Sequence, residues 1–215
     1  TPSSYPELID LLEQACNDTM KEAGLKPSTI ALTAPGLVDY QSQRVIYSPN
    51  LHYLDGRKPG EDLSRRIDVP VLLVHEEEAL CEAERVYGEA DGVENFLLVD
   101  VSSGVGMTAI SGGRYVRGTR GMGGELGHMT VRPQGKPCGC GNRGCLETEV
   151  NDRLFVEQMR EQLANPDLSM DDVLAQVRQG EGDALPVLEP MFRSLAVCLA
   201  AMINVFSPEA VFLVG

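Results

Sequence analysis

A histidine and three cysteines stand close together in one glycine-rich stretch of the sequence. They are His128, Cys138, Cys140 and Cys145, within GMGGELGHMTVRPQGKPCGCGNRGCLE at residues 121–147. One imidazole nitrogen and three thiolates are enough to complete the tetrahedral shell of a zinc ion. Two cysteines separated by one residue are poorly placed to bridge each other, so the spacing favours a metal over a disulfide. Four protein ligands leave no open position, which predicts a structural Zn²⁺; free thiols or a disulfide in an exported protein are the alternatives.

The composition is that of an ordinary globular protein with an acidic surface. Of 215 residues, 43% are hydrophobic and 23% are charged, and the net charge is -14. This sign argues against phosphate contacts with nucleic acid by this chain alone. No apolar run approaches the roughly 18 residues of a membrane span, and no secretory leader begins the chain. We therefore expect a cytoplasmic protein without a membrane partner, in which Cys16, Cys81 and Cys198 are buried free thiols.

Hydrophobic periodicity predicts an α/β architecture, because segments of strand pattern alternate with segments of helix pattern. The expected strands lie at 29–33, 69–74, 96–101, 107–110 and 210–214, with a hairpin or a short strand within 38–47. The expected helices lie at 6–23, 62–67, 76–87, 150–163, 170–179 and 184–205. The polar pair Asp91-Gly92 predicts a boundary between an N-terminal domain, 1–91, and a C-terminal domain, 92–215. A final strand without a covering helix and a first helix without a preceding strand indicate a piece of a longer protein.

The cysteine-rich stretch resembles the signature of the ROK family (repressors, open reading frames and sugar kinases). Further landmarks of that family follow the right order: APGLVD at 34–39, SPNL at 48–51, the strand-to-helix junction at 74–84 and PEAVFLVG at 208–215. The resemblance implies an actin-like, ribonuclease-H-like ATPase fold of two α/β domains, here truncated at both ends. It also implies a hexose or amino-sugar site in the cleft, and a homodimer or homotetramer.

The resemblance assigns the sugar contacts to seven residues: Gly36, Asn50, His75, Glu76, Glu125, His128 and Glu147. Gly36 would line the site with its backbone, and Glu125 and Glu147 would accept hydrogen bonds from sugar hydroxyls. His128 would bind zinc through one ring nitrogen and point the other at a hydroxyl, because a metal-bound imidazole keeps one directed N–H. The alternatives are an exposed loop acid for Glu125 and, for Glu147, an acid favoured at a helix start by the dipole.

The junction after the second strand departs from the kinase members. These carry Asn-Asp-Ala-Asn there, with the Asp as the base that deprotonates the sugar hydroxyl, whereas this sequence reads His75-Glu76-Glu77-Glu78. Glu76 could still act as the base, but a displaced carboxylate can cost about 10²-fold in rate. Repressor members commonly carry a histidine where His75 stands. We interpret Glu77 and Glu78 as acids of a first helical turn, favoured there by the dipole.

Four residues replace the Gly-Thr-Gly phosphate loop of the kinase members: Ser102, Ser103, Gly104 and Gly106. A hydroxyl and a glycine remain, but the first glycine, which permits close backbone approach to phosphate, is lost. The other phosphate loop of the kinases has no counterpart before Ile30, and adenine-binding elements are absent after Gly215. We therefore expect poor ATP binding by this chain.

These features together predict the sugar-sensing effector and oligomerisation part of a ROK-type transcriptional regulator of the NagC-like branch. It would contact DNA only through a helix-turn-helix domain upstream of this chain. The alternatives are an ATP-dependent sugar kinase, of the glucokinase or N-acetylhexosamine kinase kind, and a binding module with neither role. The kinase alternative requires ATP and Mg²⁺, with Glu76 in the position of the base.

Overall fold

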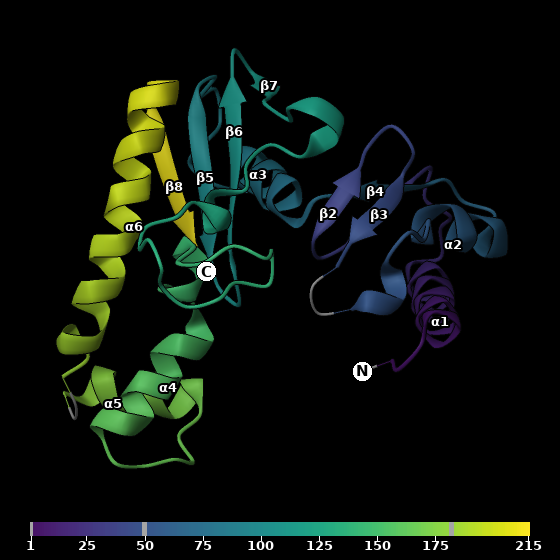
Figure 1. Ribbon diagram of the computed structural model, residues 1–215. Coiled ribbons are helices and arrows are strands. Elements are labelled where there is room, and N and C mark those ends of the chain that lie inside the picture. The colour runs from purple at the N-terminus through teal and green to yellow at the C-terminus, as the bar shows by residue number, and fades with distance from the viewer. Residues whose placement is uncertain (1, 49–50, 181–182) are drawn as a thin grey trace. The chain divides into compact units, whose positions relative to one another are not determined.

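The computed structural model describes residues 2–48, 51–180 and 183–215 (Figure 1). Contacts divide the chain into two compact units. Unit 1 comprises Thr1–Gly88 and Arg117–Gly123, and unit 2 comprises Glu89–Val116 and Gly124–Gly215. The division after Gly88 falls close to the boundary expected at 91/92. The return of Arg117–Gly123 to unit 1 has no counterpart in the sequence prediction, which assigned that segment to the C-terminal domain.

Unit 1 contains a parallel strand pair and an antiparallel hairpin. Its elements are α1 (Tyr5–Ala23), β1 (Ile30–Thr33), β2 (Leu37–Asp39), β3 (Arg44–Tyr47), α2 (Pro59–Ile67), β4 (Val71–Val74) and α3 (Glu76–Tyr87). β1 pairs with β4 in parallel, and β2 pairs with β3 in antiparallel. Apolar side chains of α1 and α2 pack together with those of β1 and β4. Helix α3 begins two residues after the end of β4, at the carboxyl end of the parallel strand pair.

Two element bounds in unit 1 differ from the prediction by more than one residue, and proline explains both. Helix α2 begins at Pro59 rather than at residue 62. Proline fits the first helical turn because its fixed φ suits the helix and its missing N–H has no partner there anyway. Strand β4 begins at Val71 rather than at residue 69, after Pro70, whose nitrogen has no hydrogen to donate to a ladder.

Unit 2 is built on a four-stranded mixed sheet in the order β7-β6-β5-β8. Its elements are β5 (Phe96–Val101), β6 (Val105–Ser111), β7 (Arg114–Tyr115), α4 (Asp152–Gln162), α5 (Met170–Gln179), α6 (Leu185–Phe206) and β8 (Ala210–Val214). β5 pairs with β8 in parallel and with β6 in antiparallel. Figure 1 shows α6 running beside β8, with α4 and α5 next to its first turns. The predicted α/β class is confirmed.

The cysteine-rich stretch is anchored in the hydrophobic core of unit 2 by two buried leucines. Leu97 of β5 and Met107 of β6 are buried together with Leu126 and Leu146. Leu126 and Leu146 begin two 3-10 turns, η3 (Leu126–His128) and η4 (Leu146–Thr148), which lie before and after the three cysteines of the stretch. The stretch is therefore attached to the hydrophobic core at both ends, while its middle is free to form a loop.

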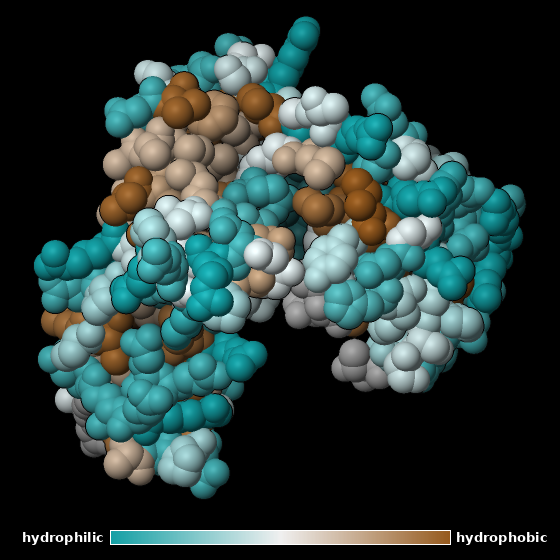
Figure 2. Space-filling view, in the orientation of Figure 1, coloured by the Kyte–Doolittle hydropathy of each residue, from teal (hydrophilic) through white to brown (hydrophobic). Residues whose placement is uncertain are grey.

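Helix α6 is the one helix of the described residues that is long and apolar enough to cross a membrane, contrary to the expectation from sequence. Length and composition alone are weak evidence, because core helices of soluble proteins meet the same criterion. One face of α6 is buried in the core of unit 2 through Val187, Met191, Leu195 and Cys198. Other apolar residues of this helix are exposed, namely Leu185, Phe192, Val197, Ile203 and Val205, and Figure 2 shows hydrophobic atoms over the upper part of the helix.

Candidate functional site

The four predicted zinc ligands lie together in unit 2. One ligand atom from each of His128, Cys138, Cys140 and Cys145 lies within 4.8 Å of the other three. Cys138 Sγ is 3.6 Å from His128 Nδ1, and Cys140 Sγ is 3.7 Å from Cys145 Sγ. Zinc–sulfur bonds of about 2.3 Å at tetrahedral angles separate two sulfurs by roughly 3.8 Å, so these spacings fit one zinc ion. All six cysteines are free thiols, which excludes the disulfide alternative in this structure.

Backbone hydrogen bonds fold the loop so that the three cysteines converge. The Gly141 N–H donates to the Cys138 carbonyl (3.0 Å), and the Cys138 N–H donates to the Asn142 carbonyl (2.9 Å). These two bonds close a tight turn around the Cys-x-Cys pair. The Leu146 N–H donates to the Met129 carbonyl (2.8 Å), which brings the end of the stretch back beside η3. Cys138 and Cys145 are buried, while Cys140 is exposed.

The three thiols differ in acidity because their surroundings differ. Burial raises the pKa of Cys138, and a hydrogen bond from its thiol to Glu147 Oε1 (2.7 Å) raises it further. Burial also raises the pKa of Cys145. Burial acts in the same sense on Cys140, but the backbone N–H of Asn142 and the two neighbouring thiols outweigh it and lower that pKa. The cluster therefore favours the anionic form at its exposed member.

Two carboxylates flank His128 on opposite sides of its ring. Glu125 Oε2 lies 3.6 Å from Nε2, and Glu147 Oε1 lies 3.4 Å from Nδ1. Both carboxylates are partly exposed, with side-chain exposures of 40% and 28%. Asn151, which caps α4 by accepting from the Leu154 N–H, also donates to the Glu147 carbonyl (2.6 Å). The three predicted sugar-binding residues of unit 2 are thus brought together beside the cysteine cluster.

Glycine is required at position 124, directly before Glu125. Gly124 has φ +95°, a left-handed conformation, and a Cβ added there would lie 2.2 Å from the Met107 carbonyl oxygen. The chain therefore passes against strand β6 with no room for a side chain. This close approach fixes where Glu125 and η3 begin. The sequence pattern suggested the carboxylate and the histidine, but the contact with β6 becomes visible only in the folded chain.

The remaining predicted sugar-binding residues fall in unit 1 or outside the described residues. Gly36 lies between β1 and β2 with φ +93°. His75 is the N-cap of α3, and its Nε2 atom is buried without a hydrogen-bond partner among the described residues. Glu76, the first residue of α3, is exposed. Asn50 lies outside the described residues.

Glu78 is not the ordinary first-turn acid that the sequence suggested. Its side chain is 10% exposed, and both of its oxygens accept hydrogen bonds from Arg117, from Nε at 2.7 Å and from Nη2 at 2.9 Å. The helix dipole would favour an acid here whether or not it was buried, so the sequence signal was the same for both cases. Arg117 lies 39 residues further along the chain, and no local pattern links the two.

The predicted phosphate loop forms the turn between β5 and β6. The Ser102 hydroxyl donates to Asp100 Oδ2 (3.0 Å), and the Ser102 N–H donates to the Gly104 carbonyl (3.0 Å). A Cβ added at Gly104 would lie 3.9 Å from Glu147 Oε2. The Ser102 hydroxyl and N–H of this loop, which also contains Ser103 and Gly106, are therefore already hydrogen-bonded within the protein. The Glu147 carboxylate lies next to the loop.

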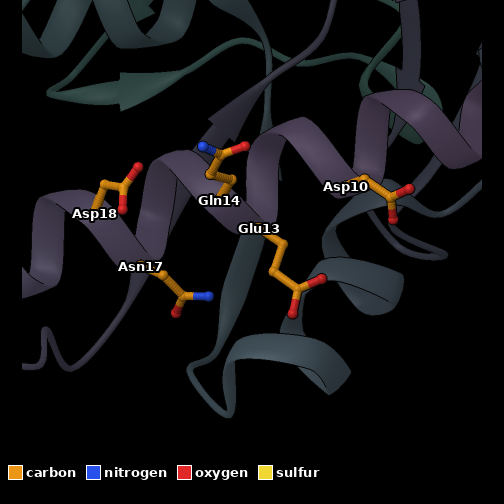
Figure 3. Close-up of a pocket in the computed structure, with 5 residues that line it drawn as sticks. All are labelled: Asp10, Glu13, Gln14, Asn17 and Asp18. Carbon is orange, nitrogen blue, oxygen red and sulfur yellow. The ribbon is translucent and has the colours of Figure 1, made fainter.

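A shallow hollow on the outer side of α1 offers no competing site. It is lined by Asp10, Glu13, Gln14, Asn17 and Asp18, all from this one helix (Figure 3). Asp10 and Glu13 form ion pairs with Arg66. The remaining polar side chains lie along the helix surface and do not converge on a common point. The hollow is therefore an acidic, solvated helix face.

The comparisons with known proteins agree with the motifs. The model of the ROK family matches residues 1–215. The chain belongs to the ROK family. It is 30% identical to the xylose repressor of Bacillus subtilis, over 86% of this chain and 47% of the repressor.

Solved structures of ROK proteins share the fold of this chain. The ROK hexokinase from Thermus thermophilus is similar with a TM-score of 0.80 and 30% identity, covering the whole chain and 72% of the hexokinase. A ROK family transcriptional regulator, a homologue of Escherichia coli MLC protein, has a TM-score of 0.82 and 30% identity, covering 98% of the chain and 56% of the regulator. This ROK chain thus has both regulator and sugar kinase relatives. It spans about half the length of the curated repressors that it matches.

Replacing Gly124 by alanine should lower the free energy of unfolding of this ROK chain and weaken ligand binding beside Glu125. We expect a loss of about 1–3 kcal/mol in the free energy of unfolding, because the new Cβ meets the Met107 carbonyl in a left-handed backbone. Chemical denaturation measures this loss. Gly112→Ala is the matched control, since Gly112 also has a positive φ but has open space around it. Equal losses in the two variants would contradict the close-approach argument.

Proposed function

We propose that this chain is the sugar-binding part of a ROK-type transcriptional regulator, in which a structural zinc ion supports the sugar site. The observation that carries the proposal is the arrangement around His128. Its Nδ1 faces Cys138 and the other candidate ligands, while its Nε2 faces Glu125. The same ring thus connects a metal-binding cluster with a carboxylate that has the chemistry to accept sugar hydroxyls.

The donor set of the cluster fits zinc. The residues that would hold the ion are His128 through Nδ1, Cys138, Cys140 and Cys145. Zinc supplies a structural crosslink when bound, since four protein ligands leave no position for water or substrate. With Nδ1 used in this way, the ring proton of His128 is held on Nε2, where the imidazole can donate to a hydroxyl.

Glu147 has two competing partners in this scheme. Its Oε1 atom accepts a hydrogen bond from the Cys138 thiol and also lies 3.4 Å from His128 Nδ1. A cysteine bound to a metal is a thiolate and has no proton to donate. Metal binding therefore removes the Cys138–Glu147 hydrogen bond. Glu147 is then left to accept from another donor, and a sugar hydroxyl is a donor of the right kind.

The regulator is favoured over the kinase by three features of the residues that a kinase would use. The kinase base is replaced by Glu76, the neighbouring residue is His75, and the hydroxyl and N–H of Ser102 bond within their own loop. The xylose repressor and the ROK regulator are 30% identical to this chain, and so is the ROK hexokinase, so the relatives are compatible with either candidate. A bound sugar would shift the chain between states that differ in DNA affinity, and contact with DNA would come from a domain outside this chain.

The kinase is the second candidate because a carboxylate still stands in the position of the base. Glu76 is exposed in the first turn of α3, where it is accessible to a substrate. The similar ROK hexokinase shows that this fold also occurs in a kinase. In that case ATP and Mg²⁺ would be required. A cytoplasmic location and assembly into a homodimer or homotetramer belong to both candidates.

Metal analysis tests the zinc site. Protein purified without chelator should contain about one zinc per chain. Cys145→Ser should lose the metal and lower the melting temperature, because it removes a buried ligand. Cys81→Ser is the matched control, since Cys81 is equally buried but lies outside the cluster. Metal-free protein, or equal behaviour of the two variants, would refute the zinc proposal.

Calorimetric titration with glucose, N-acetylglucosamine, N-acetylmannosamine and xylose tests the sugar site. At least one of them should bind, and Glu125→Gln should weaken that binding about tenfold or more, because a hydrogen bond to a charged acceptor is lost. Glu157→Gln is the control, as Glu157 is an acid of unit 2 that pairs with Arg153 on α4.

Incubating the complete protein with ATP and the sugar that binds separates the two candidates. The regulator predicts no phosphorylated sugar. Turnover that disappears in Glu76→Ala would instead establish the kinase, because loss of the carboxylate would remove its base.

A further inference from the structure

A fork-shaped ion pair at the start of α3 has no role in the proposed site. The two oxygens of Glu78 accept from Nε and Nη2 of Arg117, in the bidentate geometry that an arginine makes with a carboxylate. Glu78 is nearly buried, and the pairing with Glu78 raises the pKa of the Arg117 guanidinium. The Arg117 side chain is 45% exposed, so the attraction is partly screened by solvent, and desolvation of Glu78 offsets part of the rest. The main effect of the ion pair is to hold two segments in one geometry.

Tyr40 connects this ion pair to His75. The Arg117 guanidinium lies over the Tyr40 ring at 4.7 Å from its centroid, a cation–π contact. The Tyr40 hydroxyl accepts a hydrogen bond from the backbone N–H of His75 (2.9 Å) and makes another with Glu78. The rings of Tyr40 and His75 lie 5.3 Å apart. Moving Arg117 therefore disturbs both the backbone and the ring of His75.

The segment of Arg117 packs tightly on the same tyrosine. A Cβ added at Gly121 would lie 2.3 Å from the Tyr40 ring, and Gly121 has φ +83°. The Gly123 N–H donates to the Arg117 carbonyl (2.8 Å), so the segment 117–123 closes on itself. This segment is the part of unit 1 that returns from the β6–β7 hairpin. Glu125 follows two residues after it in the sequence.

We propose that Glu78, Arg117 and Tyr40 form a clamp within unit 1 that positions the sugar-binding residues at the start of α3. The clamp fixes His75 and the first turn of α3, where Glu76 stands. It also fixes the segment 117–123 of unit 1. The proposal rests on the proposed sugar site. The three clamp residues act through their neighbours and are positioning residues, with no contact to sugar required.

Sugar titration of three clamp variants of the complete protein tests this assignment. Arg117→Ala should weaken binding at least about tenfold, because it unpairs a nearly buried carboxylate and uncovers Tyr40. Arg117→Lys keeps the charge but loses the fork, so it should recover part of the affinity. Tyr40→Phe should give a smaller loss, since it keeps the ring under Arg117 and removes only the hydroxyl. Arg85→Ala should bind normally, as its partner Glu82 forms an exposed pair on the same helix.

Hydrogen exchange and zinc content distinguish positioning from general damage. Arg117→Ala should exchange faster at 75–78 and 117–123, while the zinc content stays that of the unchanged protein. Folded Arg117→Ala that binds sugar with unchanged affinity would overturn the clamp and leave the sugar site standing. If that variant does not fold, Tyr40→Phe decides by the same criterion. Absence of sugar binding by the unchanged protein would overturn both the proposed function and the clamp.

Discussion

The candidate site depends on one constraint: four side chains that could hold a metal ion must converge on a loop with little apolar surface of its own. Leu126 and Leu146 attach the two ends of this loop to the core of unit 2. Between them the residues are mostly glycines, charged residues and cysteines, and the described backbone is held by turns rather than by a sheet. A segment of this size cannot bury enough hydrophobic area to fix itself. A metal ion in the ligand cluster would take the place of that missing core.

A fixed loop also fixes the orientation of the His128 ring relative to the neighbouring carboxylate. His128 belongs to the cluster through Nδ1 and reaches Glu125 through Nε2. A ring that rotated freely could present either nitrogen, so the direction of its N–H would not be fixed. Sugars offer vicinal hydroxyls that both donate and accept, so a carboxylate and an imidazole N–H of fixed direction suit them. The candidate metal ligands and the proposed sugar contacts therefore share the residue His128, and disruption of the ligand cluster should disorganise the sugar contacts.

The parts that could be predicted from the sequence are those with a local signal. The clustering of His128, Cys138, Cys140 and Cys145 is predicted by residue type and spacing, and β5 and α6 by their apolar periodicity. The starts of α2 and β4 differ from the prediction because proline favours a first helical turn and cannot donate to a strand ladder, and hydrophobic periodicity does not include either effect. The pair of Glu78 and Arg117 could not be found in this way, because the residues are 39 positions apart and an acid in a first helical turn is ordinary. Contacts that join distant segments follow from packing, which one sequence does not display.

The same packing argues against phosphate at the loop that a kinase would use. The Ser102 hydroxyl and N–H, which would otherwise point at an anion, bond to Asp100 and to the Gly104 carbonyl. Asp100 and Glu147 place carboxylates on either side of this turn, and the chain carries a net charge of -14. A triphosphate brought here would meet the negative charge of these carboxylates, so a magnesium ion would have to offset the repulsion. Sugar hydroxyls meet the same carboxylates as hydrogen-bond acceptors. The two carboxylates beside this turn thus suit a neutral ligand better than an anionic one.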